Sequence, residues 1–315
     1  MIAVVGATAA GKSDLAIELA LRLGGEVVNV DSMQLYRGMD IGTAKLPLDE
    51  RRGVPHHLLD IWDVTQTASV AEYQRLADQV MDDIRARGKV PVLAGGSGLY
   101  VRAALGDLDF PGTDEAVRER LAAELATAGP ALLHDRLAAL DPVAAAVILP
   151  SNGRRIVRAL EVMEISGQPF SATMPSYGSG AGQGRPAIQV GIRMPRPELD
   201  RRIESRVDRM FAQGLEREVR ELDGRHGLRD GRTASRALGY QQVLRSLDGD
   251  WTLEQARDET VRATRRFARR QESWFRRDPR VAWVDAGDDL PGRVLGVLDS
   301  VTSRRTASVP LRQAD

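Results

Sequence analysis

The chain has 315 residues, and its 44 lysines and arginines are balanced by 44 aspartates and glutamates, so its formal net charge is zero. With 43% hydrophobic and 28% charged residues, the composition is that of a folded globular protein and excludes a largely disordered chain. No apolar run approaches the roughly 18–20 residues that a spanning helix needs, so we expect no membrane partner. Cysteine is absent, which excludes disulfides and thiolate metal sites. With no leader before the first expected strand, we expect a cytoplasmic protein.

Short apolar runs alternate with helical patterns over the first third of the chain. Buried strands are expected at 2–5, 27–30, 58–61 and 90–93, and helices at 13–23, 70–86 and 99–105. A strand–helix alternation of this kind predicts an α/β fold in which a mostly parallel sheet is flanked by helices.

The pattern then changes to helices alone. Helices are expected at 113–126, 130–140 and 151–166, followed by a glycine-rich loop at 176–186, an edge strand at 188–192 and further helices, including one at 252–278. We therefore predict an α/β core made of residues 1–111 and 187–288, an all-helical insertion domain at 112–186, and a C-terminal helix with a disordered tail at 289–315.

A phosphate-loop motif follows the first expected strand and opens the first expected helix. It consists of Gly6, Ala7, Thr8, Ala9, Ala10, Gly11, Lys12 and Ser13, and matches G-x-x-x-x-G-K-[ST]. Backbone N–H groups at such a helix N-terminus bind phosphates, Lys12 adds a positive charge, and a serine in the position of Ser13 ligates Mg²⁺. A glycine-rich structural turn is the alternative. The motif predicts a phosphate-bearing ligand but not the reaction.

Two further strand ends are expected at the same edge of the sheet. Asp31 follows the second strand, where a carboxylate could hold Mg²⁺, act as a general base, or only cap a helix. Ser97 lies in a Gly-Gly-Ser-Gly turn after the fourth strand, which ends without the acidic residue that Walker-type ATPases use for Mg²⁺. The chain also lacks an Asn-Lys-x-Asp segment, which argues against a regulatory GTPase.

Arginines gather on one side of the expected 252–278 helix, which Thr252 and Gln255 begin as a capping box. They are Arg262, Arg265, Arg266, Arg269, Arg270, Arg276 and Arg277. A solvated helix face is the alternative, but such faces mix charges of both signs, so a nucleic-acid contact is favoured. Another cluster, Arg201, Arg202 and Arg206, alternates with acids and could neutralise itself. His56 and His57 point to opposite sides of an extended segment, so we expect structural roles and no metal site.

Taken together, these motifs resemble the bacterial tRNA dimethylallyltransferase family. The resemblance rests on segments 6–13, 31–45, 55–60, 95–100, 155–162, 237–240 and 269–275, and the segment that begins at Asp31 is the most specific. It implies a P-loop NTPase-like core with a helical insertion. It also implies that dimethylallyl diphosphate, with Mg²⁺, alkylates the exocyclic N6 amine of adenosine 37, next to the anticodon of a tRNA. The expected partners are a tRNA anticodon stem-loop and the donor, and we expect a monomer.

The resemblance also implies roles for particular residues. Asp31 would accept a proton from the adenine amine, Ser97 would assist, and residues 6–13 would hold the diphosphate with Mg²⁺ on Ser13. Expected tRNA contacts are Asp31, Ser32, Met33, Gln34, Ser97, Arg118, Arg154, Arg155, Ile156, Val157, Arg158, Arg236, Gly239, Tyr240 and Gln241, to which helical geometry adds Arg269 and Arg270. The family often has threonine where this chain has Ser13 and Ser97, and the zinc-finger extension of eukaryotic relatives is absent.

Two other classes of function remain possible from the sequence. A small-molecule phosphoryl transferase of the nucleotide- or shikimate-kinase type shares the loop and the sheet, but it needs ATP turnover and an acidic Mg²⁺ site. A non-catalytic RNA-binding module would keep the phosphate loop only as a structural relic. Asp31→Ala distinguishes them, because in a prenyltransferase it should abolish transfer and leave the affinity for tRNA roughly intact.

Overall fold

The computed structural model describes residues 1–108, 112–173 and 184–307, with side chains up to residue 301. The chain divides into two compact units, residues 1–105 with 184–315 and residues 106–183, and each is described by itself. Most of the expected glycine-rich loop and the end of the expected tail, 308–315, lie outside the described residues.

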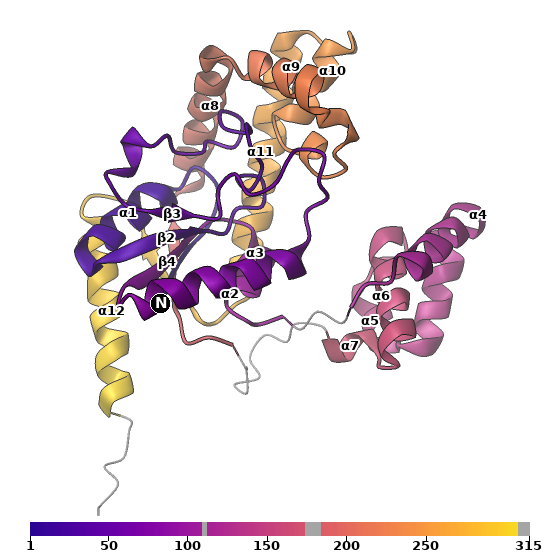
Figure 1. Cartoon of the computed structure of the whole chain (residues 1–315), viewed down its shortest axis with the longest axis horizontal. Helices are drawn as coiled ribbons and strands as arrows, with labels where there is room; N and C mark the ends of the chain where they lie inside the picture. The colour runs from indigo at the N-terminus through magenta and orange to yellow at the C-terminus, as the bar shows by residue number, and fades with distance from the viewer. Residues whose placement is uncertain (109–111, 174–183, 308–315) are drawn as a thin grey trace, which may run out of the picture. The chain divides into compact units, whose positions relative to one another are not determined.

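The first unit is built on a six-stranded sheet in the order β3-β2-β4-β1-β5-β6 (Figure 1). All neighbouring strands are parallel, as the strand–helix alternation predicts. The strands are β1 (Ile2–Val5), β2 (Gly25–Asn29), β3 (His56–His57), β4 (Val90–Ala94), β5 (Ile188–Arg193) and β6 (Val281–Asp285).

Helices cover both faces of this sheet. On one face, α1 (Lys12–Leu23) and α12 (Leu290–Ala307) pack on alternate strand residues such as Val4, Val92 and Val190, because successive side chains of a strand point to opposite sides. The other face carries α2 (Val70–Ala86) and α3 (Gly98–Ala104). The α2 bounds are those that the sequence predicts.

A group of helices extends the first unit beyond the sheet (Figure 1). It contains α8 (Arg196–Gln213), α9 (Leu215–His226), α10 (Tyr240–Leu247) and α11 (Leu253–Arg276). The short 3₁₀ turns η2 (Leu228–Asp230) and η3 (Ala234–Arg236) contact α9 and α10, and a third turn, η1 (Asp49–Arg51), follows β2 in the chain. Helix α11 packs on both α8 and α10, and Thr252 and Gln255 form the expected capping box at its start.

Two strand predictions are wrong. Residues 58–61 are not a strand, because Leu58 and Asp60 have φ angles of 59° and 57°, in the left-handed region that extended backbone excludes; the strand is the short β3 just before them. The strand at 188–192 is not at an edge, because β6 pairs with it. We did not predict β6, a five-residue strand directly after the longest helix of this unit.

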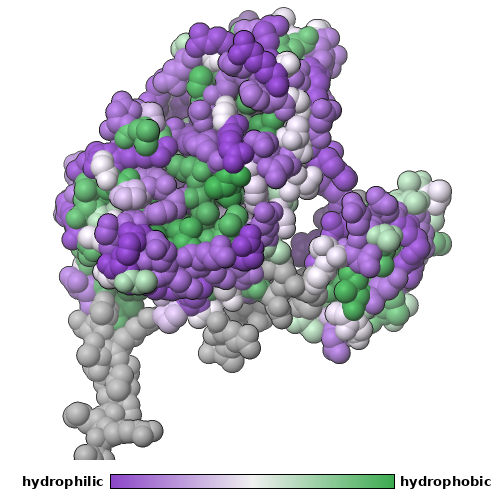
Figure 2. All heavy atoms as spheres, in the orientation of Figure 1, coloured by the Kyte–Doolittle hydropathy of each residue, from purple (hydrophilic) through white to green (hydrophobic). Residues whose placement is uncertain are grey.

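The second unit is helical throughout its described residues, as predicted. It contains α4 (Glu115–Leu140), α5 (Pro142–Val147), α6 (Gly153–Ser166) and α7 (Phe170–Thr173), and its core includes Leu121, Leu137 and Ile156. Gly129, with a φ of 79°, bends α4, so the two helices expected at 113–126 and 130–140 are its two arms. Figure 2 shows a mostly hydrophilic surface on the visible face of this unit, with hydrophobic patches. Among the described residues, no helix has the length and apolar character to cross a membrane.

Candidate active site

The phosphate loop joins β1 to α1 and turns sharply through three residues with left-handed backbone. Gly6, Ala9 and Gly11 have φ angles of 136°, 65° and 91°. Within the loop, the Lys12 Nζ atom donates a 2.6 Å hydrogen bond to the carbonyl of Ala7. The Ser13 side chain is exposed at the first turn of α1. The motif therefore has the strand–loop–helix setting in which such loops bind phosphate.

Lys12 faces an unusual electrostatic environment. Burial, and then the positive charge of Arg206, lower the pKa of Lys12 from 10.5 to about 8, and the carboxylate of Asp31 opposes this shift. A buried amine beside another cation is stabilised by a bound anion, because the anion restores the charge balance. The loop is therefore a site for a negatively charged ligand.

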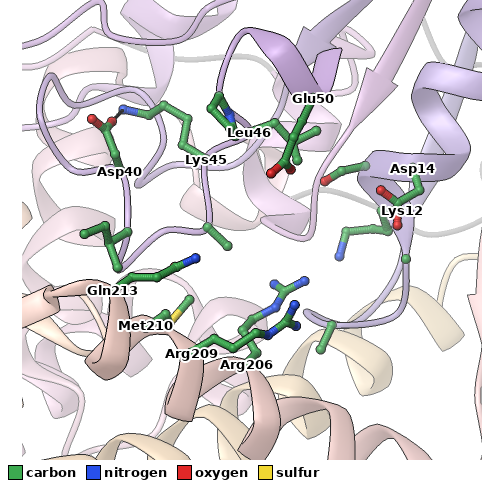
Figure 3. Close-up of a pocket in the computed structure, with 16 residues that line it drawn as sticks. Lys12, Asp14, Asp40, Lys45, Leu46, Glu50, Arg206, Arg209, Met210 and Gln213 are labelled. Atoms are coloured by element: carbon green, nitrogen blue, oxygen red, sulfur yellow. Dashed lines mark hydrogen bonds and ion pairs between the residues drawn. The ribbon is translucent and has the colours of Figure 1, made fainter. Parts of the chain in front are cut away.

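The phosphate loop, the start of α1, α8 and the segment 40–50 line a cavity of about 490 Å³. In Figure 3, Lys12 projects into it from the loop, and Arg206 and Arg209 project from α8 on the opposite side. The Arg206 guanidinium donates a 3.3 Å hydrogen bond to the hydroxyl of Thr8. Burial and the neighbouring Arg209 lower the pKa of Arg206. Three cations thus converge where a polyanion can bind.

Arg206 lines this cavity, but the sequence analysis did not select it as a site residue. The prediction that its cluster neutralises itself holds for Arg202, which pairs with Glu198, but it is wrong for Arg206, which forms no ion pair within the described part of the chain. Helical spacing was the signal: the positions three and four residues before and after Arg206 carry no acid, whereas Arg202 has one at i−4.

A second cavity, of about 330 Å³, adjoins the first. Its lining includes Thr8, Asp31, Ser32, Met33 and Ser97, so it brings together three of the sheet-edge segments that the sequence analysis selected. Arg206 and Met210 of α8 line both cavities. The proposed anion site and the cavity that contains Asp31 therefore share the α8 segment of Arg206 and Met210 as part of their lining.

Asp31 is held in place through its backbone. Asn29 accepts a 2.9 Å hydrogen bond from the Asp31 N–H and donates a 3.0 Å bond to the Asp31 carbonyl. The Asp31 Oδ1 atom accepts a 2.9 Å bond from the N–H of Met33, and Oδ2 has no hydrogen-bond partner within the described residues. One carboxylate oxygen is therefore fixed and the other is available to a ligand.

Ser97 contacts Ser32, the residue that follows Asp31. Its Oγ atom accepts a 3.3 Å hydrogen bond from the N–H of Ser32 and lies 3.3 Å from the Ser32 hydroxyl. The two turns approach closely: a Cβ atom on Gly95 would lie 2.7 Å from the carbonyl carbon of Val30. Glycine at this position is therefore required by the contact between the two strand ends.

Gln271 of α11 joins the phosphate loop to the turn that contains Ser97. Its side-chain oxygen accepts a 2.8 Å hydrogen bond from the N–H of Thr8, and its amide nitrogen donates a 2.9 Å bond to the carbonyl of Gly96. The side chain is buried. The sequence analysis did not detect this role of Gln271, because its partners are remote in sequence.

The segment after Asp31 is fixed by one buried charge, Lys45, and one partly buried charge, Glu218. Lys45, whose side chain is 4% exposed, donates to the Tyr36 carbonyl and to the carboxylates of Asp40 and Asp60. Glu218 of α9 accepts hydrogen bonds from three successive backbone N–H groups, those of residues 40–42.

Tyr240, which was expected to contact tRNA, supports the same loop instead. It is fully buried, and its hydroxyl donates a 2.5 Å hydrogen bond to Glu218. Burial and the nearby charge of Glu218 raise the pKa of Tyr240, so the hydroxyl stays protonated and donates.

The arginine stripe on α11 is less one-signed than the sequence suggests. Acids of α11 itself and of α8 neutralise much of it: Arg262 and Arg266 pair with Glu259, Arg265 with Glu204 and Arg276 with Glu272. Within the described residues, Arg269, Arg270 and Arg277 form no ion pair. In this part of the chain, the two arginines that were selected by helical geometry, Arg269 and Arg270, are therefore exposed cations without a carboxylate partner.

The other expected RNA contacts differ in accessibility. Arg236 is exposed, Gln241 lines the Asp31 cavity, and Gly239 begins α10 with a φ of 88°. Gln34 donates a 3.1 Å hydrogen bond to the carbonyl of Thr43. These residues surround the Asp31 cavity or support its loop.

In the helical unit, the expected contacts divide into two groups. Arg154 and Arg155 are exposed, and Arg118 and Arg158 both pair with Glu161. Ile156 and Val157 are core residues, so an RNA contact in this segment would use the arginines.

The histidine pair has structural contacts, as predicted. His57 Nε2 lies 2.7 Å from a Glu26 oxygen, and His56 Nδ1 lies 2.9 Å from the Val54 carbonyl. No group of three or more His, Cys, Asp or Glu side chains in the described ranges could hold a metal ion. A metal ion at the phosphate loop would therefore take its protein ligands from single oxygen donors such as Ser13.

Comparison with known proteins decides the family. The model of the IPP transferase family matches residues 34–278, more than half of the chain. The chain belongs to the IPP transferase family. The match includes the helical unit, α8–α11 and most of the segment that Lys45 and Glu218 hold, and it agrees with the resemblance seen in the sequence.

Individual relatives of this IPP transferase match nearly its whole length. A tRNA dimethylallyltransferase of Thermobifida fusca is 67% identical over 91% of both chains, and that of Streptomyces coelicolor is 63% identical over 95% of this chain and 96% of its own. Among solved structures, the tRNA isopentenylpyrophosphate transferase of Bacillus halodurans is 41% identical, with a TM-score of 0.69 over 96% of this chain and 95% of its own. A eukaryotic dimethylallyltransferase solved while acting on tRNA is 25% identical, with a TM-score of 0.81 over 99% of this chain and 81% of its own.

Proposed function

We propose that this chain transfers a dimethylallyl group from dimethylallyl diphosphate to the exocyclic N6 amine of adenosine 37 in tRNA, next to the anticodon, with release of diphosphate. The observation that carries the proposal is the pair of adjoining cavities, one cationic and one containing Asp31, which share Arg206 and Met210. A donor with an anionic end and a reactive carbon needs this arrangement. The names of the relatives and of the solved structures support it.

The cationic cavity is the proposed diphosphate site. The N–H groups of residues 8–13 and the charges of Lys12 and Arg206 would neutralise the diphosphate as negative charge develops on it. Groups already in position for that charge lower the barrier to cleavage of the allylic C–O bond.

Mg²⁺ fits this cavity. The hydroxyl of Ser13 and the carboxylates of Asp14 and Glu50 line it, and oxygen donors of this kind, together with phosphate oxygens and water, are the ligands that Mg²⁺ prefers. Ser13 would be the principal protein ligand. A bound Mg²⁺ would supply further positive charge for the departing diphosphate.

Asp31 is the proposed general base. In the transfer, the adenine nitrogen forms a bond to the allylic carbon, the C–O bond breaks with its electrons leaving on diphosphate, and the amine proton passes to the free oxygen of Asp31. Asn29 and Met33 fix the carboxylate so that its other oxygen faces the cavity. The Ser97 hydroxyl would keep the Ser32 backbone in register beside it.

The anticodon stem-loop is the proposed RNA partner. Arg236, Gln241, Arg269 and Arg270 would contact it on the first unit, and Arg118 and the 154–158 segment on the helical unit. A base that reacts in such a cavity must leave its stack. We expect the enzyme to act as a monomer in the cytoplasm.

The decisive experiment combines the protein with unmodified tRNA, dimethylallyl diphosphate and Mg²⁺, followed by nucleoside mass spectrometry. We expect dimethylallyladenosine to form and ATP not to replace the donor. Asp31→Asn should lower kcat by about 10²–10⁴-fold while the affinity for tRNA stays close to that of the wild type. ATP turnover without a modified nucleoside would instead identify a phosphoryl transferase.

A further inference from the structure

A third cavity lies beside the Asp31 cavity, between α10 and α11. Its volume is about 310 Å³, at the lower end of the roughly 300–1,000 Å³ that is typical of small-ligand pockets. Leu238, Gln241 and Arg270 line both cavities. The third cavity, which we call the side cavity, therefore adjoins the Asp31 cavity.

The side cavity contains a planar cation held against an aromatic ring. The Arg245 guanidinium lies 4.8 Å from the centre of the Trp251 ring, and both residues line the cavity. Within the described residues Arg245 has no carboxylate partner. A planar guanidinium group that an aromatic ring holds in place offers a surface on which nucleic-acid bases stack.

A further hydrogen-bond donor belongs to the lining of the side cavity. Gln242 is 5% exposed, and its side-chain oxygen accepts a 2.8 Å hydrogen bond from the N–H of Gly239. This bond leaves the Gln242 amide nitrogen without a partner among the described residues. The amide nitrogen is therefore available to donate a hydrogen bond to an acceptor on a ligand in the cavity.

The charges around the side cavity favour an anionic ligand. Three arginines line it, Arg245, Arg266 and Arg270, against one carboxylate, Glu259. That carboxylate is already neutralised by Arg262 and Arg266. Arg270 lies where the side cavity meets the Asp31 cavity, which suits it to the phosphate between two successive nucleotides.

We propose that the side cavity binds the nucleotide adjacent to the target adenosine in the RNA strand, with its base stacked on Arg245, its edge on Gln242 and its phosphate on Arg270. The proposal rests on the proposed function, because it takes the ligand of the Asp31 cavity to be a nucleotide. It makes Arg245 and Trp251 specificity-determining residues: they select the RNA by the base beside the target, while the donor does not contact them.

The test uses binding and kinetics with a synthetic stem-loop RNA that carries the target adenosine. Arg245→Ala and Trp251→Ala should raise the Kd and KM for this RNA by about 5- to 100-fold, the range for loss of a stacked base, and leave the KM for dimethylallyl diphosphate unchanged. Arg245→Lys keeps the charge but not the planar face, so we expect it to be as impaired as the alanine variant. Arg220→Gln, which removes an exposed arginine paired with Glu216 on α9, is the matched control and should bind RNA like the wild type.

Stem-loops with an abasic site on either side of the target identify the bound nucleotide. One of the two abasic RNAs should bind the wild type with the same reduced affinity that intact RNA shows for Arg245→Ala. The Arg245→Ala variant should bind that abasic RNA and intact RNA with equal affinity. Restoration of affinity by Arg245→Lys, or wild-type binding of both abasic RNAs, would overturn the proposal. Because RNA binding is measured directly, these results stand even if no prenyl transfer occurs, which would refute the proposed function instead.

Discussion

Gln271 accepts a 2.8 Å hydrogen bond from the backbone N–H of Thr8, although the two residues are 263 positions apart in the sequence. The same side chain donates to Gly96. Helix α11, which carries exposed arginines on its outer face, is thereby joined to the loop that would hold the donor. The buried side-chain amide of Gln271 thus connects the proposed diphosphate site to the helix that is proposed to contact RNA.

Loss of this amide should affect both stability and donor binding. In Gln271→Met the Thr8 N–H and the Gly96 carbonyl lose their partners, which should lower the free energy of unfolding by about 1–3 kcal/mol and raise the KM for dimethylallyl diphosphate. Gln271→Glu keeps the acceptor for Thr8 and loses only the bond to Gly96, so its donor KM should be closer to that of the wild type. Urea unfolding and steady-state kinetics measure the two effects, and equal donor KM values in all three proteins would contradict this role.

The lowered pKa of Lys12 predicts how the affinity for diphosphate depends on pH. With a pKa of about 8, the amine loses its proton as the pH rises through 8, and the cavity then loses one of its cations. The affinity for inorganic diphosphate should fall above pH 8, by at most about tenfold per pH unit. Lys12→Arg stays charged over this range and should lack that fall. Calorimetric titrations between pH 7 and 9 would refute the assignment if both proteins gave the same profile.

The same shift has the opposite consequence for stability. The pKa of Lys12 falls from its ordinary value of 10.5 to about 8 in the folded chain. Between pH 8 and pH 10.5 the unfolded chain therefore binds more protons than the folded chain. The contribution of Lys12 to stability is therefore least favourable below pH 8 and increases with pH between 8 and 10.5. Urea unfolding of Lys12→Met should lack this increase.

Glu218 should stabilise the loop that follows Asp31. Its carboxylate accepts three backbone N–H bonds and the Tyr240 hydroxyl, and a hydrogen bond to a charged group contributes about 1.5–3 kcal/mol. We expect Glu218→Ala to lower the free energy of unfolding by at least that amount and to speed proteolysis near residues 40–42. Glu221→Gln, which alters an exposed pair with Arg225 on the same helix, should change stability by less than about 1 kcal/mol. Equal effects of the two changes would contradict the anchoring role.

Arg269 and Arg270 should contribute to RNA binding through charge. Replacement of either by glutamate should weaken tRNA binding and reduce the slope of log K against log salt by roughly 0.7–0.9 for each phosphate that the variant no longer neutralises. Arg225→Glu, at an exposed site on α9, is the control for a general change in charge. Filter-binding assays over a range of salt concentrations measure the slope, and an unchanged slope in the α11 variants would exclude phosphate binding by these two residues.

Features that depend on local sequence were predictable. The phosphate loop, the bounds of α2 and the capping box of α11 each follow from residues within a few positions of one another. The missed strand β6 and the wrong strand at 58–61 show the limit of the same reasoning: a run of apolar residues does not reveal the left-handed backbone of Leu58 and Asp60.

Features that depend on distant partners were not predictable. Nothing near Gln271 or Glu218 in the sequence indicates that they bind the backbone of residues 8 and 40–42. The neutralisation of Arg265 likewise comes from Glu204 on another helix, so the charge pattern of α11 alone overstated the number of free cations. Arg206 is the exception, because the lack of acids at helical spacing around it was visible and was not used.

The position of β1 in the sheet has a consequence for synthesis of the chain. β1 is made first, but one of its two neighbours, β5, follows the whole helical unit, and the loop after β1 is completed by Gln271 close to the other end. A chain still emerging from the ribosome therefore has an unfinished sheet with an open strand edge. The edge of β1 that pairs with β5 therefore stays open until the segment after the helical unit has been made, and the phosphate loop gains its bond to Gln271 later still.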